Sequence, residues 1–313
     1  MQLRDLIMVF ASFASMAAGV FLPGLAEPLE AMPRLMLMVM LYLSFLAVGA
    51  GALWRELRAM SGVVCRLTLL RLFALPVLAF AVFRLIMPEF SLGALLLGAA
   101  PVGVMAAVFS LMLGANTALI LAGSIITSLL LPLSLPLLLS CMDGALRAVG
   151  AGGLNLPENF SLGGMTVSLC ITILLPFAAA VLTRNLPRLS AGILRRQFPL
   201  LTTAIVISNL GIFSNYAEVL RQSPSLILSA LLAACLLCVV MTAATLPATR
   251  GLPRQVRLAF LISFGVINNI LLMIVSNEFF TVNEALMGAA YLAPLYILLF
   301  YYRYFSRTPS PAR

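Results

Sequence analysis

The sequence contains no histidine and no lysine, and charged residues make up only 9% of its 313 positions. About a quarter of the residues of a soluble domain carry charge, so this composition excludes an ordinary soluble globular protein. The lack of histidine, together with the lack of an acidic cluster, argues against a transition-metal site. Hydrophobic residues make up 63% of the chain. We therefore predict an integral membrane protein that lies almost entirely within the bilayer.

Cysteine is scarce, and its five positions offer little chemistry. All five cysteines stand in apolar surroundings: Cys65, Cys141, Cys170, Cys235 and Cys238. The last two have the CxxC spacing of redox and metal sites, but such sites need a polar or strand-to-helix context. Packing is therefore the favoured interpretation, and no metal or other cofactor is expected. No nucleophile–base pair or metal set occurs in the apolar segments, so we do not expect an enzyme.

Long apolar runs predict an all-α fold of ten transmembrane helices, because about 20 apolar residues cross about 30 Å of hydrocarbon. The predicted spans are residues 5–24, 35–54, 62–86, 91–113, 117–141, 162–184, 199–217, 224–248, 256–277 and 283–304. The first resembles a signal peptide, but its apolar run is long enough to span, and we interpret it as a retained helix. The connector 142–161 separates a first five-helix repeat, 1–141, from a second, 162–305, and a cytoplasmic tail, 306–313, follows.

All 19 basic residues are arginines, and their distribution tests this layout. Fourteen fall on one side: Arg4, Arg55, Arg58, Arg66, Arg184, Arg188, Arg195, Arg196, Arg250, Arg254, Arg257, Arg303, Arg307 and Arg313. Four fall on the other: Arg34, Arg84, Arg147 and Arg221. The positive-inside rule places the first group, and both termini, in the cytoplasm. Arginines spread over short loops favour topology over nucleic-acid binding, so no nucleic-acid partner is expected. Halves of five spans insert in opposite orientations, the inverted-repeat plan of many secondary transporters.

Two interruptions lie in corresponding places, the fourth and ninth predicted spans. The first contains Pro101 and Gly103, and the second runs from Ser263 through Gly265 to Asn269. Proline removes a backbone donor and glycine adds backbone freedom. Freed peptide groups at membrane depth must be covered by protein or face a water-filled cavity. Paired interruptions of this kind predict a transporter binding site near the bilayer midplane.

Arg71 is the remaining arginine and the only charged side chain near the middle of a predicted span. It lies about 13 Å from the surface at about 1.5 Å per residue, and Pro76 should kink the same helix. An intramembrane arginine is by default a functional-site hypothesis, so we expect a substrate or cavity role. The alternative is a structural role, in which Arg71 pairs with backbone carbonyls freed by a break.

Polar side chains near the breaks complete the candidate site. The predicted substrate or cavity residues are Arg71, Asn268, Asn269, Ser263, Pro101, Gly103 and Gly265. The candidate ion or hydroxyl ligands are Asn116, Ser124, Thr127 and Ser128. For each hydroxyl the alternative is a hydrogen bond to the carbonyl four residues back. No aspartate or glutamate lies in the middle of a span, whereas a proton-coupled carrier usually keeps such a group.

At these residues the chain resembles the bile acid:sodium symporter family, bacterial branch. The family carries Pro-Gly-Gly-Thr-Ala-Ser-Asn in its fourth helix, then Gly-Asn-x-Ala-Leu, and Glu-x-Gly-x-Gln-Asn-Ser in its ninth helix. The corresponding segments here are Pro101-Val102-Gly103-Val104-Met105-Ala106-Ala107, then Asn116-Thr117-Ala118-Leu119, and Ser263-Phe264-Gly265-Val266-Ile267-Asn268-Asn269. The resemblance implies ten helices in a panel and a core domain, breaks that cross in helices four and nine, and alternating-access transport of an amphipathic organic anion.

The departures from the family fall on its sodium ligands. Two sodium ions lie behind the crossing in the family. Here its ligand positions hold Ala106, Ala107, Ile120, Ser263, Ile267 and Arg71. Only Ser124, which matches a threonine ligand, keeps a ligand oxygen of the family's kind. We therefore predict sodium-independent transport of a small organic anion or carboxylated metabolite across the lipid bilayer of a bacterial inner membrane. The alternatives are a sodium-coupled symporter with altered ligands and a non-transporting membrane sensor or binding protein on the same fold.

Overall fold

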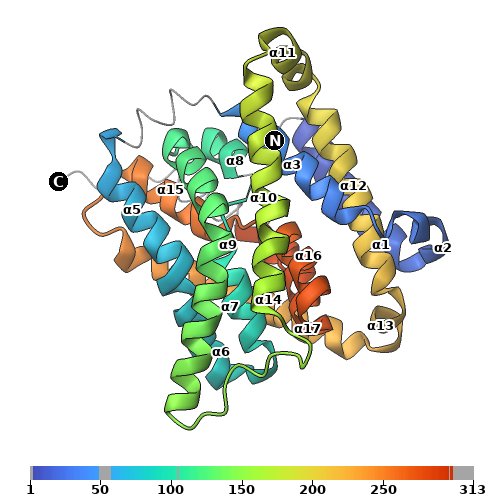
Figure 1. Ribbon diagram of the computed structural model, residues 1–313, viewed down its shortest axis with the longest axis vertical. Helices are drawn as coiled ribbons and strands as arrows, with labels where there is room; N and C mark the ends of the chain where they lie inside the picture. The colour runs from blue at the N-terminus through green and yellow to red at the C-terminus, as the bar shows by residue number, and fades with distance from the viewer. Residues whose placement is uncertain (1–2, 49–57, 104–105, 296, 299–313) are drawn as a thin grey trace. The chain divides into compact units, whose positions relative to one another are not determined.

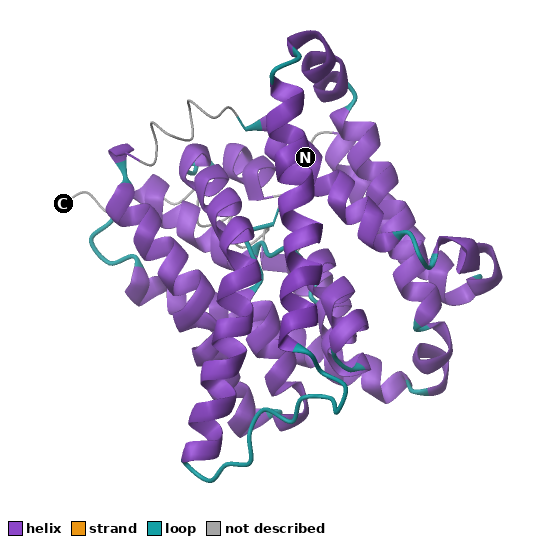
Figure 2. Ribbon diagram, in the orientation of Figure 1, coloured by secondary structure: helices purple, strands orange, loops and turns teal. Residues whose placement is uncertain are grey.

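The computed structural model describes residues 3–48, 58–103, 106–295 and 297–298, and these ranges form helices joined by short loops (Figures 1 and 2). They contain no β-strand, apart from an isolated bridge between Val102 and Ile267. Within them, five helices are long and apolar enough to cross a membrane: Ser61–Ile86, Thr117–Ala148, Leu162–Arg184, Gln197–Asn215 and Pro224–Ala248. Several shorter apolar helices accompany them. The all-α prediction is confirmed, while the count of ten spans stays a prediction.

The chain divides into two compact units, and each unit combines two segments that are separated in the sequence. Unit 1 comprises Met1–Val48 and Val167–Leu228, and unit 2 comprises Gly49–Thr166 and Ser229–Arg313. Unit 1 contains α1 (Leu3–Phe21), α2 (Pro23–Ala26), η1 (Glu27–Leu29), α3 (Pro33–Ala47), most of α10 (Leu162–Arg184), α11 (Pro187–Arg195), α12 (Gln197–Asn215) and α13 (Ala217–Gln222). Unit 2 contains α5 (Ser61–Leu69), η2 (Leu70–Ala74), α6 (Leu75–Ile86), η3 (Pro88–Phe90), α7 (Ser91–Ala99), α8 (Ala106–Leu113), α9 (Thr117–Ala148), most of α14 (Pro224–Ala248), α15 (Arg254–Gly265), α16 (Asn269–Phe279) and α17 (Val282–Ala290).

A polar cluster joins α1 to α12 inside unit 1. The Asn209 Nδ2 donates to the Ser12 carbonyl at 3.2 Å, the Ser12 Oγ at 3.1 Å and the Ser15 Oγ at 3.2 Å. Asn209 is only 1% exposed. The neighbouring Ser208 hydroxyl is also buried but has no hydrogen-bond partner among the described residues. Because lipid gives no hydrophobic driving force for helix association, such interhelical hydrogen bonds help to hold the pair together.

Two arginines fasten α3 to α10 in the same unit. Arg34 donates to the Thr172 Oγ1 and to the Ser168 carbonyl, each at 3.1 Å. Arg184 donates to the carbonyls of Phe45 and Val48. Those carbonyls belong to the end of α3, where backbone acceptors have no intrahelical partner. Arg184 therefore satisfies carbonyls at the end of α3, and Arg34 bonds to a carbonyl and a hydroxyl within α10.

In unit 2, η2 is a π-helical segment that carries Arg71 and ends two residues before Pro76. The Leu75 N–H donates to the Leu70 carbonyl, five residues back. Pro76 has no N–H to continue the regular i−4 pattern, and a π-turn is one of the known local adjustments to such a break. The distortion expected at Pro76 thus lies one turn earlier, and the helix continues from Ser61 to Ile86.

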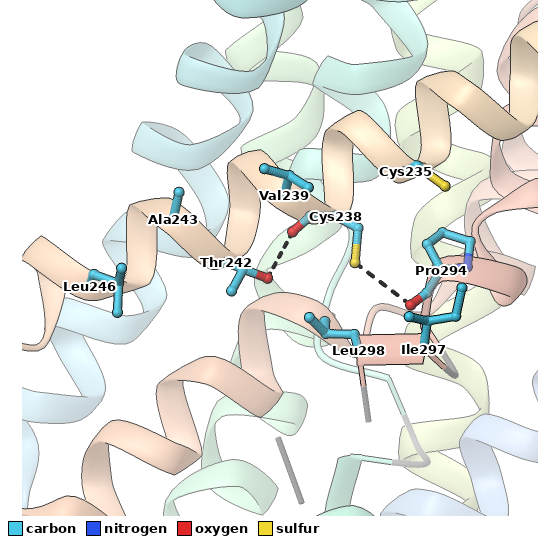
Figure 3. A pocket seen from close by; sticks show the side chains of 9 residues that line it. All are labelled: Cys235, Cys238, Val239, Thr242, Ala243, Leu246, Pro294, Ile297 and Leu298. Carbon is cyan, nitrogen blue, oxygen red and sulfur yellow. Dashed lines mark hydrogen bonds between the residues drawn. The ribbon is translucent and has the colours of Figure 1, made fainter. Parts of the chain in front are cut away.

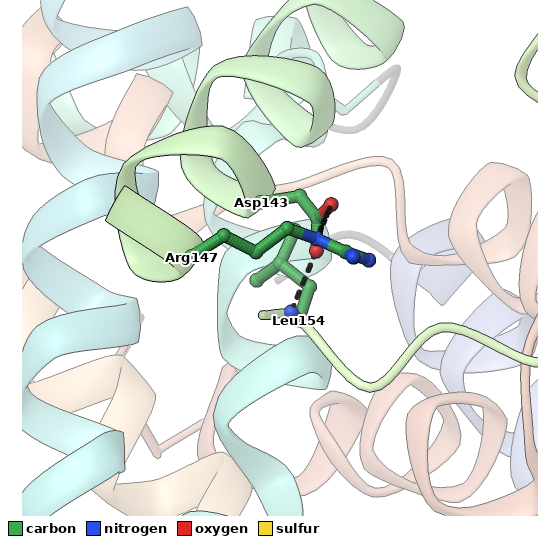
Figure 4. Close-up of polar contacts among 3 residues, drawn as sticks. All are labelled: Asp143, Arg147 and Leu154. Atoms are coloured by element: carbon green, nitrogen blue, oxygen red, sulfur yellow. Dashed lines mark hydrogen bonds and ion pairs between the residues drawn. The ribbon is translucent and has the colours of Figure 1, made fainter. Parts of the chain in front are cut away.

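The connector predicted at 142–161 is shorter than expected, because α9 continues to Ala148. Asp143 accepts a hydrogen bond at 2.7 Å from Arg147, one turn further along α9, and another at 2.9 Å from the Leu154 N–H (Figure 4). This i,i+4 ion pair supports a final helical turn beyond the apolar run. The same carboxylate fixes the loop that follows.

Other boundaries differ by a few residues or lie outside the described ranges. The seventh predicted span, 199–217, ends at Asn215, and the short α13 follows. The end of the second predicted span and Arg55 lie outside the described residues, as do residues 299–304 of the tenth span, the predicted tail 306–313, and Arg303, Arg307 and Arg313.

Replacing Asn209 by alanine tests the polar cluster. The substitution removes the donor that serves Ser12 and Ser15, so we expect a loss of about 0.5–1.5 kcal/mol in the free energy of unfolding. Ser208→Ala is the matched control, since its hydroxyl bonds to nothing among the described residues, and it should be neutral or slightly stabilising. Unfolding in detergent measures both, and equal destabilisation by the two substitutions would contradict the assignment.

Candidate functional site

The structure has a helix interruption at each of the two segments where the sequence predicts one. α7 ends at Ala99 and α8 begins at Ala106, while α15 ends at Gly265 and α16 begins at Asn269. Each interruption leaves backbone N–H and C=O groups that no helix satisfies. The site is built from the groups that satisfy them, and all of these groups lie in unit 2.

The two interruptions hydrogen-bond to each other. The Asn268 N–H donates to the Pro101 carbonyl at 2.9 Å, and the Gly103 N–H donates to the Val266 carbonyl at 2.8 Å. These two bonds form the antiparallel bridge between Val102 and Ile267. We call this pairing of Pro101–Gly103 with Val266–Asn268 the crossing. It satisfies four backbone groups that would otherwise be unpaired at membrane depth.

α9 satisfies the other edge of Val102 with two hydroxyls. The Ser124 Oγ donates to the Val102 carbonyl at 3.0 Å, and the Val102 N–H donates to the Thr127 Oγ1 at 3.3 Å. The Thr127 hydroxyl in turn donates to the Gly123 carbonyl, four residues back, at 2.7 Å. Ser124 and Thr127, both candidate ion ligands, thus serve the backbone in this structure. Ser128 is 2% exposed and follows on the same helix.

Arg71 and Tyr291 satisfy the C-terminal carbonyls of α15. The Arg71 Nη1 donates to the Phe264 carbonyl at 3.5 Å, and the Tyr291 hydroxyl donates to the Gly265 carbonyl at 3.0 Å. Arg71 is fully buried, so its charge lies at the negative end of the α15 dipole. This is the contact with freed carbonyls that the structural alternative for Arg71 requires. A contact with substrate stays a prediction.

Part of this polar environment is unpaired. The Arg71 Nε and Nη2 and the Ser263 Oγ are buried without hydrogen-bond partners among the described residues. Burying a polar group without a partner costs free energy, and a charged group costs more. The Arg71 Nε and Nη2 lie on one edge of the guanidinium, the two-donor edge that pairs side-on with a carboxylate. The site therefore holds an unused anion-binding edge next to a buried serine.

The asparagines have structural partners as well. The Asn268 Oδ1 accepts from the Leu271 N–H at 3.3 Å and caps α16, and the Asn116 Oδ1 accepts from the Leu119 N–H at 3.0 Å and caps α9. The Asn269 Nδ2 donates to the Gly288 carbonyl in α17 at 3.3 Å. Asparagine is a preferred N-cap residue because its side-chain oxygen accepts from the first helical turn. The predicted cavity-lining role of Asn268 and Asn269 stays a prediction.

Tyr291 is a member of the site that the sequence analysis missed. Its hydroxyl is buried within an apolar segment and bonds to the Gly265 carbonyl. A tyrosine in such a segment usually has a hydrogen-bond partner when it is buried. That requirement is the signal that points to Tyr291, although it does not identify the partner.

A separate apolar cavity of about 480 Å³ lies along α14 (Figure 3). Its lining residues are Cys235, Cys238, Val239, Thr242, Ala243, Leu246, Pro294, Ile297 and Leu298. The Cys238 thiol donates to the Pro294 carbonyl at 3.9 Å, and the Thr242 hydroxyl donates to the Cys238 carbonyl at 2.8 Å. None of the lining residues carries a charge that could compensate an anion. The crossing, with Arg71, is therefore the better candidate for an anion site.

Gly103 sets how closely the two chains of the crossing approach. A Cβ at this position would lie 2.7 Å from the Ile267 carbonyl oxygen and 2.9 Å from its carbon. Both are backbone atoms held by the bridge, so they cannot move aside as a flexible side chain would. Only glycine fits here without displacing the partner segment.

Gly103→Ala should therefore weaken the fold by about 1–3 kcal/mol through overpacking, measured as a lower unfolding temperature in detergent. Gly144→Ala is the control, because a Cβ at Gly144 in α9 would meet no heavy atom within 4 Å. The control should be neutral or stabilise the helix by about 0.5–1 kcal/mol. A Gly103→Ala variant as stable as the wild type would show that the crossing is looser than the structure indicates.

Comparison with known proteins identifies the family. Residues 34–245 match the model of the sodium bile acid symporter family, a range that includes Pro101–Gly103 and ends before the second break. A comparison with curated proteins finds no match. Members of the family are membrane transporters rather than enzymes, in agreement with the apolar helices and the resemblance noted above. The chain belongs to the sodium bile acid symporter family and is a membrane transporter of the bile acid and organic anion type.

Proposed function

We propose that the protein is a secondary transporter that moves a small organic anion by alternating access, without coupling to sodium. The observation that carries this proposal is the buried Arg71 guanidinium at the C-terminal end of α15, bonded to the Phe264 carbonyl. This places a permanent positive charge beside the crossing.

The charge of Arg71 is only partly balanced by the protein. The helix dipole supplies about half a negative charge at the end of α15, and no aspartate or glutamate belongs to the segments of the crossing. A buried charge without a full counter-charge is costly. An organic carboxylate bound side-on to the Arg71 Nε and Nη2 would supply the missing charge and the missing acceptors at once. This supports a carboxylated substrate with an apolar body.

Sodium independence is supported by the loss of side-chain oxygens at the ligand positions. A sodium ion needs several oxygen ligands, and carboxylates and carbonyls are the usual ones. Ala106, Ala107 and Ile267 provide no side-chain oxygen at the positions that the resemblance assigns to sodium. Ser124 and Thr127, two of the candidate hydroxyl ligands, are bonded to Val102. We infer that Arg71 provides a fixed charge in place of the mobile ion.

The proposal includes the membrane topology. We infer ten spans in two inverted repeats, residues 1–141 and 162–305, with both termini in the cytoplasm and the protein in a bacterial inner membrane. Support comes from the arginine distribution and from the helix breaks in corresponding spans. It also comes from the composition of the two units, each of which combines segments from both proposed repeats.

Sodium independence is tested by thermal unfolding of the purified protein in sodium chloride and in choline chloride at the same ionic strength. Ligand at a hundredfold excess over its dissociation constant stabilises the folded state by about 2.7 kcal/mol. We expect no sodium-specific rise in the unfolding temperature. A clear rise would instead favour sodium-coupled symport with altered ligands.

The charge proposal is tested with Arg71→Gln and Arg71→Lys. A hydrogen bond to a charged group is worth about 1.5–3 kcal/mol, so Arg71→Gln should weaken binding of apolar carboxylates by roughly 10- to 100-fold without creating sodium dependence. Arg71→Lys keeps the charge but loses the two-donor edge, and its loss should be intermediate. Isothermal calorimetry with a panel of carboxylates, followed by uptake into proteoliposomes, measures both effects.

Arg84→Gln is the matched control for lost charge, because among the described residues the Arg84 side chain donates only to the exposed Ala151 carbonyl. This variant should bind the panel as the wild type does. A folded Arg71→Gln protein with unchanged affinity would overturn the charge proposal. Binding of the panel without uptake by the wild-type protein would favour the sensor interpretation over transport.

A further inference from the structure

We propose that α11 and its flanking residues form a binding surface for anionic phospholipid headgroups. The surface consists of Leu186, Arg188, Leu189, Arg195 and Arg196. It lies in unit 1, outside the crossing, and is independent of the proposed transport mechanism.

The two flanking spans hold α11 at a membrane surface. α10 ends at Arg184 and α12 begins at Gln197, and both are long and apolar enough to span a membrane. α11, Pro187–Arg195, is joined to them by only two residues on one side and one on the other. An extended residue reaches about 3.5 Å, so α11 cannot leave the surface at which the two spans end. Figure 1 shows it as the turn between α10 and α12.

The protein leaves much of α11 exposed. None of the residues of α11 is buried. Leu186 and Leu189 remain 57% and 51% exposed. Within α11, Leu189 and the half-buried Ile193 are four residues apart and share a helix face, whereas Arg188 and Arg195, seven apart, share another. Leu186 directly precedes the helix. A short helix with an uncovered apolar face and a basic face, held at a membrane surface, has the pattern of an interfacial helix.

The charge of this surface is complementary to that of anionic headgroups. Arg188, Arg195 and Arg196 are exposed, and their side chains have no ion pair or hydrogen bond with other described residues. No aspartate or glutamate occurs in the sequence between Glu158 and Glu218. Arg184 is excluded from the proposed surface because it donates to the end of α3. Three uncompensated cations beside an apolar face fit phosphate-bearing headgroups, with the leucines inserted at the acyl boundary.

The test compares the full-length protein in nanodiscs of phosphatidylcholine alone and mixed with phosphatidylglycerol, with lipids retained after extraction counted by native mass spectrometry. We expect the wild type to retain phosphatidylglycerol preferentially, and the preference to fall as ionic strength rises. The triple variant Arg188→Ser, Arg195→Ser, Arg196→Ser should lose roughly 100-fold in affinity for the anionic lipid. Because all three positions are exposed, its unfolding temperature should stay unchanged.

Two further variants separate charge from apolar insertion. The matched lysine triple at the same positions should keep most of the preference, since the attraction depends on charge. Leu186→Ser with Leu189→Ser should weaken retention of both lipids while leaving the salt dependence intact. A wild type without preference for phosphatidylglycerol, or a serine triple that keeps it, overturns the proposal. Displacement of the lipid by polyglutamate at physiological ionic strength would also overturn it, in favour of an acidic soluble partner.

Discussion

The structure depends on satisfying backbone polar groups where two helices are interrupted inside a membrane protein. Hydrocarbon offers no hydrogen bonds, so each peptide group released by Pro101 or Gly103 needs a partner from the protein. At Val102, both backbone polar groups have hydrogen-bond partners. This residue bridges to Ile267, its carbonyl accepts from Ser124, and its N–H donates to Thr127. The positions of α9 and α15 relative to the first break follow from these few contacts.

This demand for hydrogen bonds also restricts the chemistry of the site. A hydroxyl that donates to a backbone carbonyl, as Ser124 does, has less freedom to coordinate an ion. The C-terminal carbonyls of α15 would form a cation site if they were left free, and here Arg71 and Tyr291 occupy them. A fixed guanidinium cannot dissociate as an ion does. In the proposed mechanism its charge would therefore be present in every state of the transport cycle, and only the anion would need to move.

Local sequence features predicted much of this arrangement, and the limits have a physical cause. The all-helical fold, the interruptions at Pro101–Gly103 and near Gly265, and the family were all readable, because they depend on apolar length, proline, glycine and motif order. The hydrogen-bond partners of the freed backbone groups could not be predicted from local sequence. Arg71 and Phe264 are 193 residues apart, and Tyr291 gives no local sign of bonding to Gly265. The extension of α9 to Ala148 likewise depends on Asp143 reaching Leu154 across a loop.

The arginines show why a side chain's topological and structural roles need to be separated. Arg34 and Arg184 fall on opposite sides in the predicted topology, yet both are engaged between α3 and α10. Setting aside one arginine from each side leaves the positive-inside bias unchanged, so the topology argument does not depend on them. Arg71 shares with Arg184 a bond to a carbonyl at a helix C-terminus, but Arg71 is fully buried and retains an unpaired two-donor edge. Bonds between α3 and α10 account for Arg34 and for Arg184, of which only the Nε is buried without a partner among the described residues. The bond to the end of α15 leaves the second edge of Arg71 without a function, and that edge is the part of the site best suited to an anion.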